Sequence, residues 1–265
     1  MKVTLFTGNQ VRHNRMVWAL SEVVDELYVV QECSSVFPLH AVEAYHRSQV
    51  MERYWQLVIA AEREVFGELT LGPSGVRSLP VVRGDLGQIE LQHIGPALAS
   101  DVYIVFGTGL IKGPLCDFLM DHRAVNVHMG ILPHYRGNSC NFWALYAGHP
   151  EMVGATVHLL TTELDSGPIL FHAFPKVEAA DPFLLGMKAV QAVQQAVVHY
   201  LSTREFSELT PVPQVKDLVL RHTKSREFTD EVALAYLENL PSPEFIEAAL
   251  RSRDLGSYVH PFVGH

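Results

Sequence analysis

The stretch from residue 124 to 170 constrains the fold of this chain more than any other part of the sequence. It begins with a short, mainly apolar run that predicts a buried strand. Asn126 and His128 lie two positions apart, so in an extended strand both side chains project to the same face. A second strand-like run, 155–160, leads to a polar loop that contains Asp165. An amide, an imidazole and a carboxylate therefore lie near the ends of separate elements, as expected where a carbonyl is polarised and a proton is moved.

The rest of the chain predicts alternating strands and helices. A strand at Val3 to Phe6, a helix at about 11–24 and a strand at Glu26 to Val30 make a βαβ unit with a parallel sheet. Further strands are predicted at 79–82, 101–106 and 168–174, and further helices at 39–66, 88–98, 138–147 and 182–200. The fold class is therefore α/β, a mostly parallel sheet with flanking helices. The 39–66 helix covers the sheet or, as the alternatives, forms a lid, an acceptor wall or a dimer surface.

The character of the sequence changes near residue 206. Two prolines precede a segment with two helical patterns, 230–238 and 242–252. We therefore expect a catalytic domain at 1–205 and a small, helical C-terminal appendage at 206–265, which is a poor candidate for a β-barrel. The apolar positions of this appendage are compatible with a homodimer.

Composition argues against several classes of protein. The chain of 265 residues carries 29 acidic and 20 basic side chains, a net charge of −9, which makes a large nucleic-acid interface unexpected. Its three cysteines form no C-x-x-C pair and suggest reduced thiols in a cytoplasmic protein. Because the sequence has no apolar run of 18 residues, we expect no contact with a membrane.

The spacing of several motifs resembles one known family. These motifs are Asn126-x-His128, Leu132-Pro133-x-Tyr135-x-Gly137, Gly154-x-Thr156-x-His158 and Leu164-Asp165-x-Gly167-Pro168-Ile169. In this order they resemble the formyltransferases that use 10-formyltetrahydrofolate, which include the glycinamide ribonucleotide, methionyl-tRNA and amino-sugar enzymes. The resemblance implies a Rossmann-like formyltransferase fold. It also implies 10-formyltetrahydrofolate as the co-substrate and requires no metal.

The resemblance also implies a role for each motif residue. Asn126 would donate a hydrogen bond to the oxyanion, His128 would transfer a proton, and Asp165 would orient His128 or a water molecule. The expected folate-binding residues are Phe106, Gly107, Leu110, Ile111, Thr161, Thr162 and Glu163. The expected acceptor-binding residues are Asn9, Gln10, Arg12, Met129, Tyr135 and Arg136. Asn9 follows Gly8 where the first strand meets a helix N-terminus, which is a natural anion site.

Two other kinds of site fit the sequence less well. The Gly107-x-Gly109 pair is typical of a dinucleotide loop, but the third glycine that this motif needs is replaced by Lys112. Histidines 122, 128 and 134 are spaced six residues apart, which matches no common zinc pattern.

The favoured reaction is formyl transfer to the amine of a small acceptor, with a nucleotide-linked amino sugar as the first choice. The alternatives are another amine (glycinamide ribonucleotide, an amino acid, a peptide or an aminoacyl-tRNA), a formyltetrahydrofolate hydrolase, and a non-catalytic folate- or nucleotide-binding module.

Overall fold

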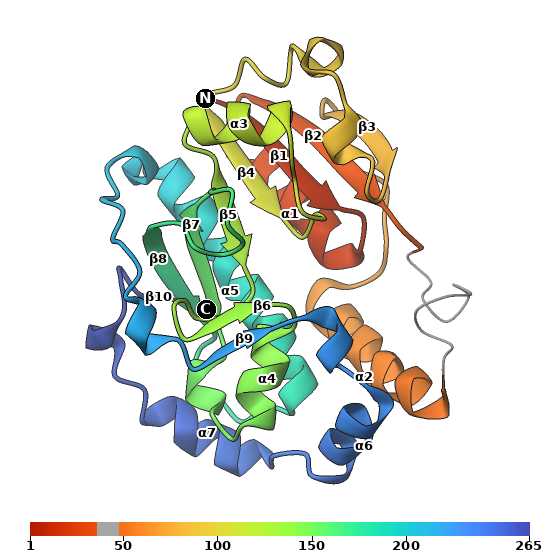
Figure 1. Cartoon of the computed structure of the whole chain (residues 1–265), viewed down its shortest axis with the longest axis vertical. Coiled ribbons are helices and arrows are strands. Elements are labelled where there is room, and N and C mark those ends of the chain that lie inside the picture. Colours follow the sequence, from red (N-terminus) through yellow and green to blue (C-terminus); the bar gives the residue numbers. More distant parts are fainter. Residues whose placement is uncertain (36–47) are drawn as a thin grey trace.

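A twisted, mostly parallel sheet forms the centre of the molecule (Figure 1). The computed structural model describes residues 1–35 and 48–265. Within them the main sheet has eight strands in the order β10-β8-β7-β5-β4-β1-β2-β3. These strands are β1 (Lys2–Gly8), β2 (Glu26–Cys33), β3 (Arg77–Val82), β4 (Val102–Phe106), β5 (Val125–His128), β7 (Ala155–Leu159), β8 (Ile169–Phe174) and β10 (Phe262–Val263). Five neighbouring strands, from β3 to β5, are parallel, and β7 is antiparallel to both of its neighbours.

Helices cover both faces of this sheet, so the core is built in three layers. The helices are α1 (Val11–Ser21), α2 (Gln49–Phe66), α3 (Pro114–Asp121), α4 (Cys140–Tyr146), α5 (Pro182–Ser202), α6 (Asp230–Glu238) and α7 (Pro243–Arg251). Val3 and Leu5 of β1 pack in the cluster that contains the apolar faces of α1 and α5. Phe6 points to the opposite face and packs in the cluster that contains α3. This alternation is the two-residue period of a strand that is buried on both sides.

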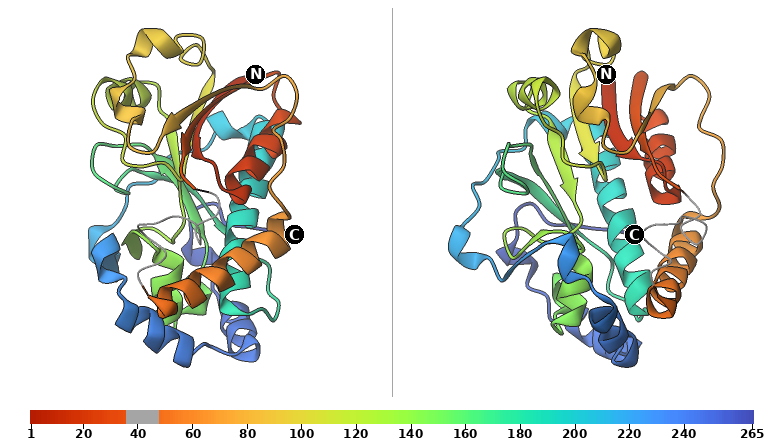
Figure 2. Two further views of the ribbon diagram at one scale, coloured as in Figure 1. Left: turned by 90° about the vertical axis from the view of Figure 1, so that its right-hand side faces the viewer. Right: turned by 45° about the vertical axis from the view of Figure 1, so that its right-hand side comes forward.

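The helix α5 illustrates how the sequence sets these boundaries. Asp181 caps its N-terminus by accepting hydrogen bonds from the backbone N–H groups of Phe183 and Leu184. Pro182 occupies the first helical position, where its missing N–H costs nothing. The helix then runs along the sheet and contacts β7, β8 and β10 (Figure 2).

The C-terminal segment packs along the lower side of the catalytic part, as seen in Figure 1. A short strand, β9 (Arg221–Thr223), pairs with β6 (Tyr135–Gly137) in a separate two-stranded parallel sheet. The last strand, β10, joins the main sheet beside β8. Among its apolar residues, Leu237 and Leu250 are buried, whereas Leu234 and Phe245 are exposed. The division at residue 205 and the homodimer stay predictions.

Most predicted elements are confirmed, two predictions fail, and one helix was not predicted. The segment 88–98 forms two 3-10 turns, Leu86–Gln88 and Leu91–Ile94, because Gly95 and Pro96 interrupt any longer helix. The helix predicted over 39–66 begins at Gln49, after Ser48 caps its N-terminus. Residues 39–47 of that prediction lie outside the described residues. Helix α3 was not expected from the sequence.

Candidate active site

The antiparallel pairing of β5 with β7 brings Asn126 against His158. The two residues are cross-strand partners, and Nδ2 of Asn126 lies 3.0 Å from Nε2 of His158. The other ring nitrogen of His158, Nδ1, lies 2.9 Å from the carbonyl oxygen of Leu159 and must therefore carry the proton. Nε2 then accepts one N–H of the Asn126 amide. The second N–H of that amide remains available to a ligand.

His128, two residues further along β5, is held between two oxygen acceptors. Its Nδ1 lies 3.3 Å from Oδ1 of Asp165, and its Nε2 lies 3.1 Å from the carbonyl oxygen of Tyr135. Only a doubly protonated ring donates at both positions. Burial by itself would lower the pKa of His128, but the Cys140 sulfur and the Asp165 carboxylate raise this pKa well above its ordinary value. His128 is therefore a buried imidazolium.

Asp165 is fixed by contacts from three parts of the chain. Its backbone adopts a left-handed conformation, with φ at 52°, in the loop between β7 and β8. Oδ2 accepts the backbone N–H of Gly137 at 3.0 Å, and the side chain of Gln214 donates to the carbonyls of Asp165 and Gly167 at 2.9 and 2.8 Å. Burial would raise the pKa of Asp165, but the charge and hydrogen bond of His128 hold it far below its usual range. The carboxylate thus stays ionised.

These side chains line a cavity of about 1350 Å³ at the carboxyl ends of the parallel strands. That is larger than a typical pocket for one small molecule, about 300–1000 Å³, so it has room for two substrates. Asn126, His128 and Asp165 all face it. The other predicted site residues that line it are Phe106, Gly107, Leu110, Ile111, Thr161, Glu163, Gln10, Arg12 and Met129. Their binding roles stay predictions.

Four predicted binding residues do not line the cavity. The amide of Asn9 makes two hydrogen bonds to the backbone of Ser34. Tyr135 is buried, with 2% of its surface exposed, and presents its backbone carbonyl to His128. Arg136 donates to the carbonyl oxygen of Leu164 and so braces the loop before Asp165. Thr162 also lies outside the lining.

Arg12 lines the cavity but is already ion-paired. Its backbone N–H and its guanidinium both donate to Oε1 of Glu62 on α2, at 3.0 and 2.9 Å. Gln194 of α5 donates to the backbone carbonyl of Arg12 at 2.7 Å. The first turn of α1 is therefore tied to both neighbouring helices, and its position beside the cavity is fixed.

Several cavity residues were not selected from the sequence. His158 belongs to a quoted motif, but its contact with Asn126 depends on the register of β5 with β7. One wall is aromatic, with residues from α2, α4, α5 and the C-terminal segment: Tyr54, Phe142, Phe183, Phe228 and Tyr236. In the sequence these residues have the pattern of ordinary core positions. No local pattern shows that four separate segments meet at one cavity.

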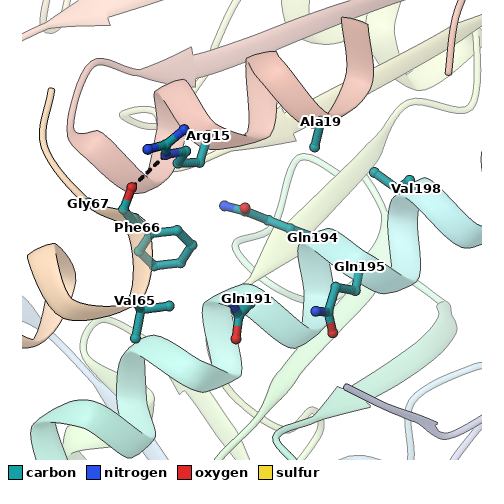
Figure 3. Close-up of a pocket in the computed structure, with 9 residues that line it drawn as sticks. All are labelled: Arg15, Ala19, Val65, Phe66, Gly67, Gln191, Gln194, Gln195 and Val198. Atoms are coloured by element: carbon teal, nitrogen blue, oxygen red, sulfur yellow. Dashed lines mark hydrogen bonds between the residues drawn. The ribbon is translucent and has the colours of Figure 1, made fainter. Parts of the chain in front are cut away.

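A smaller pocket of about 480 Å³ lies between α1, the end of α2 and α5 (Figure 3). It is lined by Arg15, Ala19, Val65, Phe66, Gly67, Gln191, Gln194, Gln195 and Val198. Arg15 donates to the backbone carbonyl of Phe66, so its side chain is engaged at the pocket wall. No histidine, cysteine or carboxylate faces this pocket, which makes it a poor candidate for proton-transfer chemistry.

Residues 1–35 and 48–265 lack two further classes of feature. No group of three or more histidine, cysteine or carboxylate side chains is placed there to hold a metal ion. None of the helices in that part combines the length and apolar character that crossing a bilayer requires.

The geometry therefore defines an α/β protein with a buried imidazolium-carboxylate pair and an amide donor at one cavity. Residues 81–198, which contain all three groups, match the formyl transferase family model. This part of the chain is therefore similar to the formyl transferase family, as its motifs suggested.

Known proteins of this family differ in their acceptors. The chain is 35% identical to a Synechococcus methionyl-tRNA formyltransferase over 119 residues, which is 44% of this chain and 37% of that protein. It is 36% identical to Escherichia coli phosphoribosylglycinamide formyltransferase over 92 residues, 35% of this chain and 43% of that one. The chain thus spans less than half the length of these relatives.

One solved structure has a similar fold over most of the chain. It is an N-formyltransferase from Helicobacter canadensis, in complex with folinic acid and dTDP-3-aminofucose. The match covers 86% of this chain and 73% of that one, with a TM-score of 0.52 and 10% sequence identity. At that identity the likeness shows the fold alone.

Proposed function

We propose that this protein transfers a formyl group from 10-formyltetrahydrofolate to the amine of a small acceptor, with a nucleotide-linked amino sugar as the favoured class. The observation that carries the proposal is the arrangement of Asn126, His128 and Asp165 at one large cavity, inside the segment that matches the formyl transferase family model. The folate side would be Phe106, Gly107, Leu110 and Ile111, which supply an apolar wall for a pterin ring.

Asn126 would stabilise the charge that develops on the formyl oxygen. When an amine attacks the formyl carbon, the carbonyl oxygen becomes an oxyanion. The amide N–H of Asn126 that His158 does not occupy can donate to it. Because β5 and β7 fix this amide in place, it needs no reorganisation during the reaction. A single donor of this kind contributes about 10² to 10³ in rate.

His128 would supply positive charge and a proton at the same place. As an imidazolium it favours the oxyanion electrostatically. It can protonate the folate nitrogen as the formyl group leaves, and regain a proton from the nitrogen of the acceptor amine, which loses one proton when the amide forms. Asp165 keeps His128 charged although the pair is buried. The amine must attack in its neutral form, and a site that already holds a cation disfavours a charged ammonium.

The acceptor class rests on separate observations. The net charge of −9 disfavours a large nucleic acid, which needs neutralising cations. Residues 206–265 fold as α6, α7 and short strands and do not form a barrel. A protein of similar fold was solved with an amino-sugar nucleotide and a folate together. Each of these favours a small acceptor.

The test is a direct assay of the purified protein. It is incubated with 10-formyltetrahydrofolate and a panel of amines that contains UDP- and dTDP-linked 3-amino and 4-amino sugars, glycinamide ribonucleotide and aminoacylated initiator tRNA. We expect tetrahydrofolate and an N-formyl product with at least one amino-sugar nucleotide. Formylation confined to the ribonucleotide or the tRNA would refute the acceptor class. Tetrahydrofolate released without any amine would indicate a hydrolase.

A further inference from the structure

His13 is a buried histidine beside the cavity that the proposed mechanism does not use. It lies in the first turn of α1, with 3% of its surface exposed. Its ring stands edge-on to Phe106, with centroids 4.9 Å apart. The ring fits between two glycines that end neighbouring strands. A Cβ added to Gly8 would lie 2.5 Å from Nδ1, and one added to Gly107 would lie 2.3 Å from Nε2.

Both glycines are therefore needed for the ring to occupy this place. Gly8 ends β1, and Gly107, with φ at 73°, follows β4. Since β1 and β4 are adjacent in the sheet, the ring of His13 lies over the carboxyl ends of two strands, where parallel α/β sheets bind their ligands.

One polar atom of this ring has no partner among the described residues. Nδ1 is buried without a hydrogen bond within that part of the chain. His172 provides the contrast, because its two ring nitrogens contact the carbonyl oxygen of Leu132 at 2.8 Å and the backbone N–H of Val259 at 3.1 Å. An unsatisfied buried polar group costs about 1–3 kcal/mol. Such a cost in a cavity wall calls for an explanation in terms of a ligand.

The surroundings of His13 also fix its charge. Burial, together with the positive charges of Arg12 and Arg83, lowers the pKa of His13 well below its ordinary value. The ring is therefore neutral, whereas His128 in the same cavity is charged. Two titratable groups whose environments push their pKa values apart are typical of a site that needs one proton acceptor and one proton donor.

We propose that His13 binds the acceptor, with its neutral imidazole accepting a hydrogen bond from the reacting amine or a hydroxyl beside it. This inference rests on the proposed function. Three observations about the position of His13 support it. His13 adjoins Gln10 and Arg12 on the acceptor side, it touches Gly107 on the folate side, and β4 is the neighbour of the strand that carries Asn126. It therefore lies where the two halves of the cavity meet.

A neutral imidazole suits this task better than a cation would. It can accept an N–H or O–H from the acceptor without adding a second positive charge beside His128. It also favours the free amine, which is the form that attacks.

The test compares His13→Leu with His13→Gln, and uses His172→Leu as the buried control. For His13→Leu we expect kcat/KM for the best acceptor of the amine panel to fall by at least about tenfold. The affinity for folinic acid, measured by calorimetry, should stay within about twofold, because the folate wall is intact. His13→Gln, which keeps a hydrogen-bonding group, should recover part of the loss.

Unfolding separates this role from a structural one. His13→Leu removes an unsatisfied polar group and should keep or raise the midpoint of urea unfolding, whereas His172→Leu leaves two polar partners unpaired and should lower it. If His13→Leu keeps its acceptor kcat/KM within about twofold, or destabilises the protein as much as His172→Leu, the inference is overturned while the proposed function stands. If the wild type formylates no amine of the panel, both fail.

Discussion

Replacing Asp165 by Asn tests whether His128 is charged. In the structure Nδ1 of His128 lies 3.3 Å from Oδ1 of Asp165, and both side chains are about 6% exposed. At an effective dielectric constant near 20, two unit charges at this 3.3 Å separation attract by about 5 kcal/mol. Removing one partner of a buried pair typically costs about 3–5 kcal/mol. Asp165→Asn should therefore lower the free energy of unfolding by a measurable part of this cost of about 3–5 kcal/mol.

The pH dependence of the stability lost in Asp165→Asn identifies the cause of that loss. In the wild type the raised pKa of His128 gives a stability contribution that is complete below about pH 6.5, the unfolded value, and is lost as the pH rises through the folded pKa. The lowered pKa of Asp165 gives a contribution that is complete above about pH 3.9 and is lost as the pH falls towards the folded value.

In the variant the pKa of His128 falls. Without the carboxylate, burial still lowers this pKa and only the contribution of Cys140 is left to raise it. The stability gap between wild type and Asp165→Asn should therefore widen by up to about 1.4 kcal/mol per pH unit as the pH falls from the raised folded pKa of His128 in the wild type towards its lower folded pKa in the variant.

Urea unfolding between about pH 5 and pH 8 measures this gap directly. The matched control is Glu163→Gln in the same loop, whose side chain is 70% exposed and lies 3.7 Å from Arg136. Because the Glu163 carboxylate is exposed to solvent, Glu163→Gln should change stability by less than about 1 kcal/mol with little pH dependence. A gap for Asp165→Asn that is constant with pH would show that Asp165 is not the group that keeps His128 charged.

Three further predictions concern the supports of the site. Gly137→Ala would place a Cβ 2.1 Å from the carbonyl oxygen of Thr223, at a φ of 89°, so it should separate β6 from β9 and lower the unfolding free energy by at least about 1–3 kcal/mol, as urea unfolding would show. Gln214→Ala removes both hydrogen bonds to the Asp165 loop and should lower kcat more than it raises the KM for folate; equal effects on the two constants would argue for a merely structural contact. Gln191→Ala, in the smaller pocket, should leave turnover unchanged and stability within about 0.5 kcal/mol.

Local patterns predicted the fold well where an element carries its own boundaries. Helix α6 occupies the predicted range because Thr229 caps its start and its apolar face is regular. The strands β1, β4 and β8 are buried apolar runs next to turn residues. The segment 88–98 was misread because its apolar spacing is helical although Gly95 and Pro96 break it.

The residues of the candidate site could be selected from the sequence, but the contacts between them could not be predicted. Asn126 and His128 share one strand, so their common direction follows from a two-residue period. The contact of Asn126 with His158 depends on an antiparallel register that no local pattern specifies. The brace of Asp165 by Gln214 joins segments 49 residues apart, and is a product of tertiary packing. The burial of His13 is likewise visible only in the structure.

The central claim is that the Asn126 amide stabilises an oxyanion formed during formyl transfer. The most direct measurement is the single-turnover rate of formyl transfer from 10-formyltetrahydrofolate to the preferred acceptor, in the wild type and in Asn126→Ala, with both substrates saturating. We expect the single-turnover rate of Asn126→Ala to be lower than that of the wild type by a factor of about 10² to 10³, with unchanged affinity for folinic acid. A variant that keeps more than about a tenth of the wild-type rate would contradict the central claim.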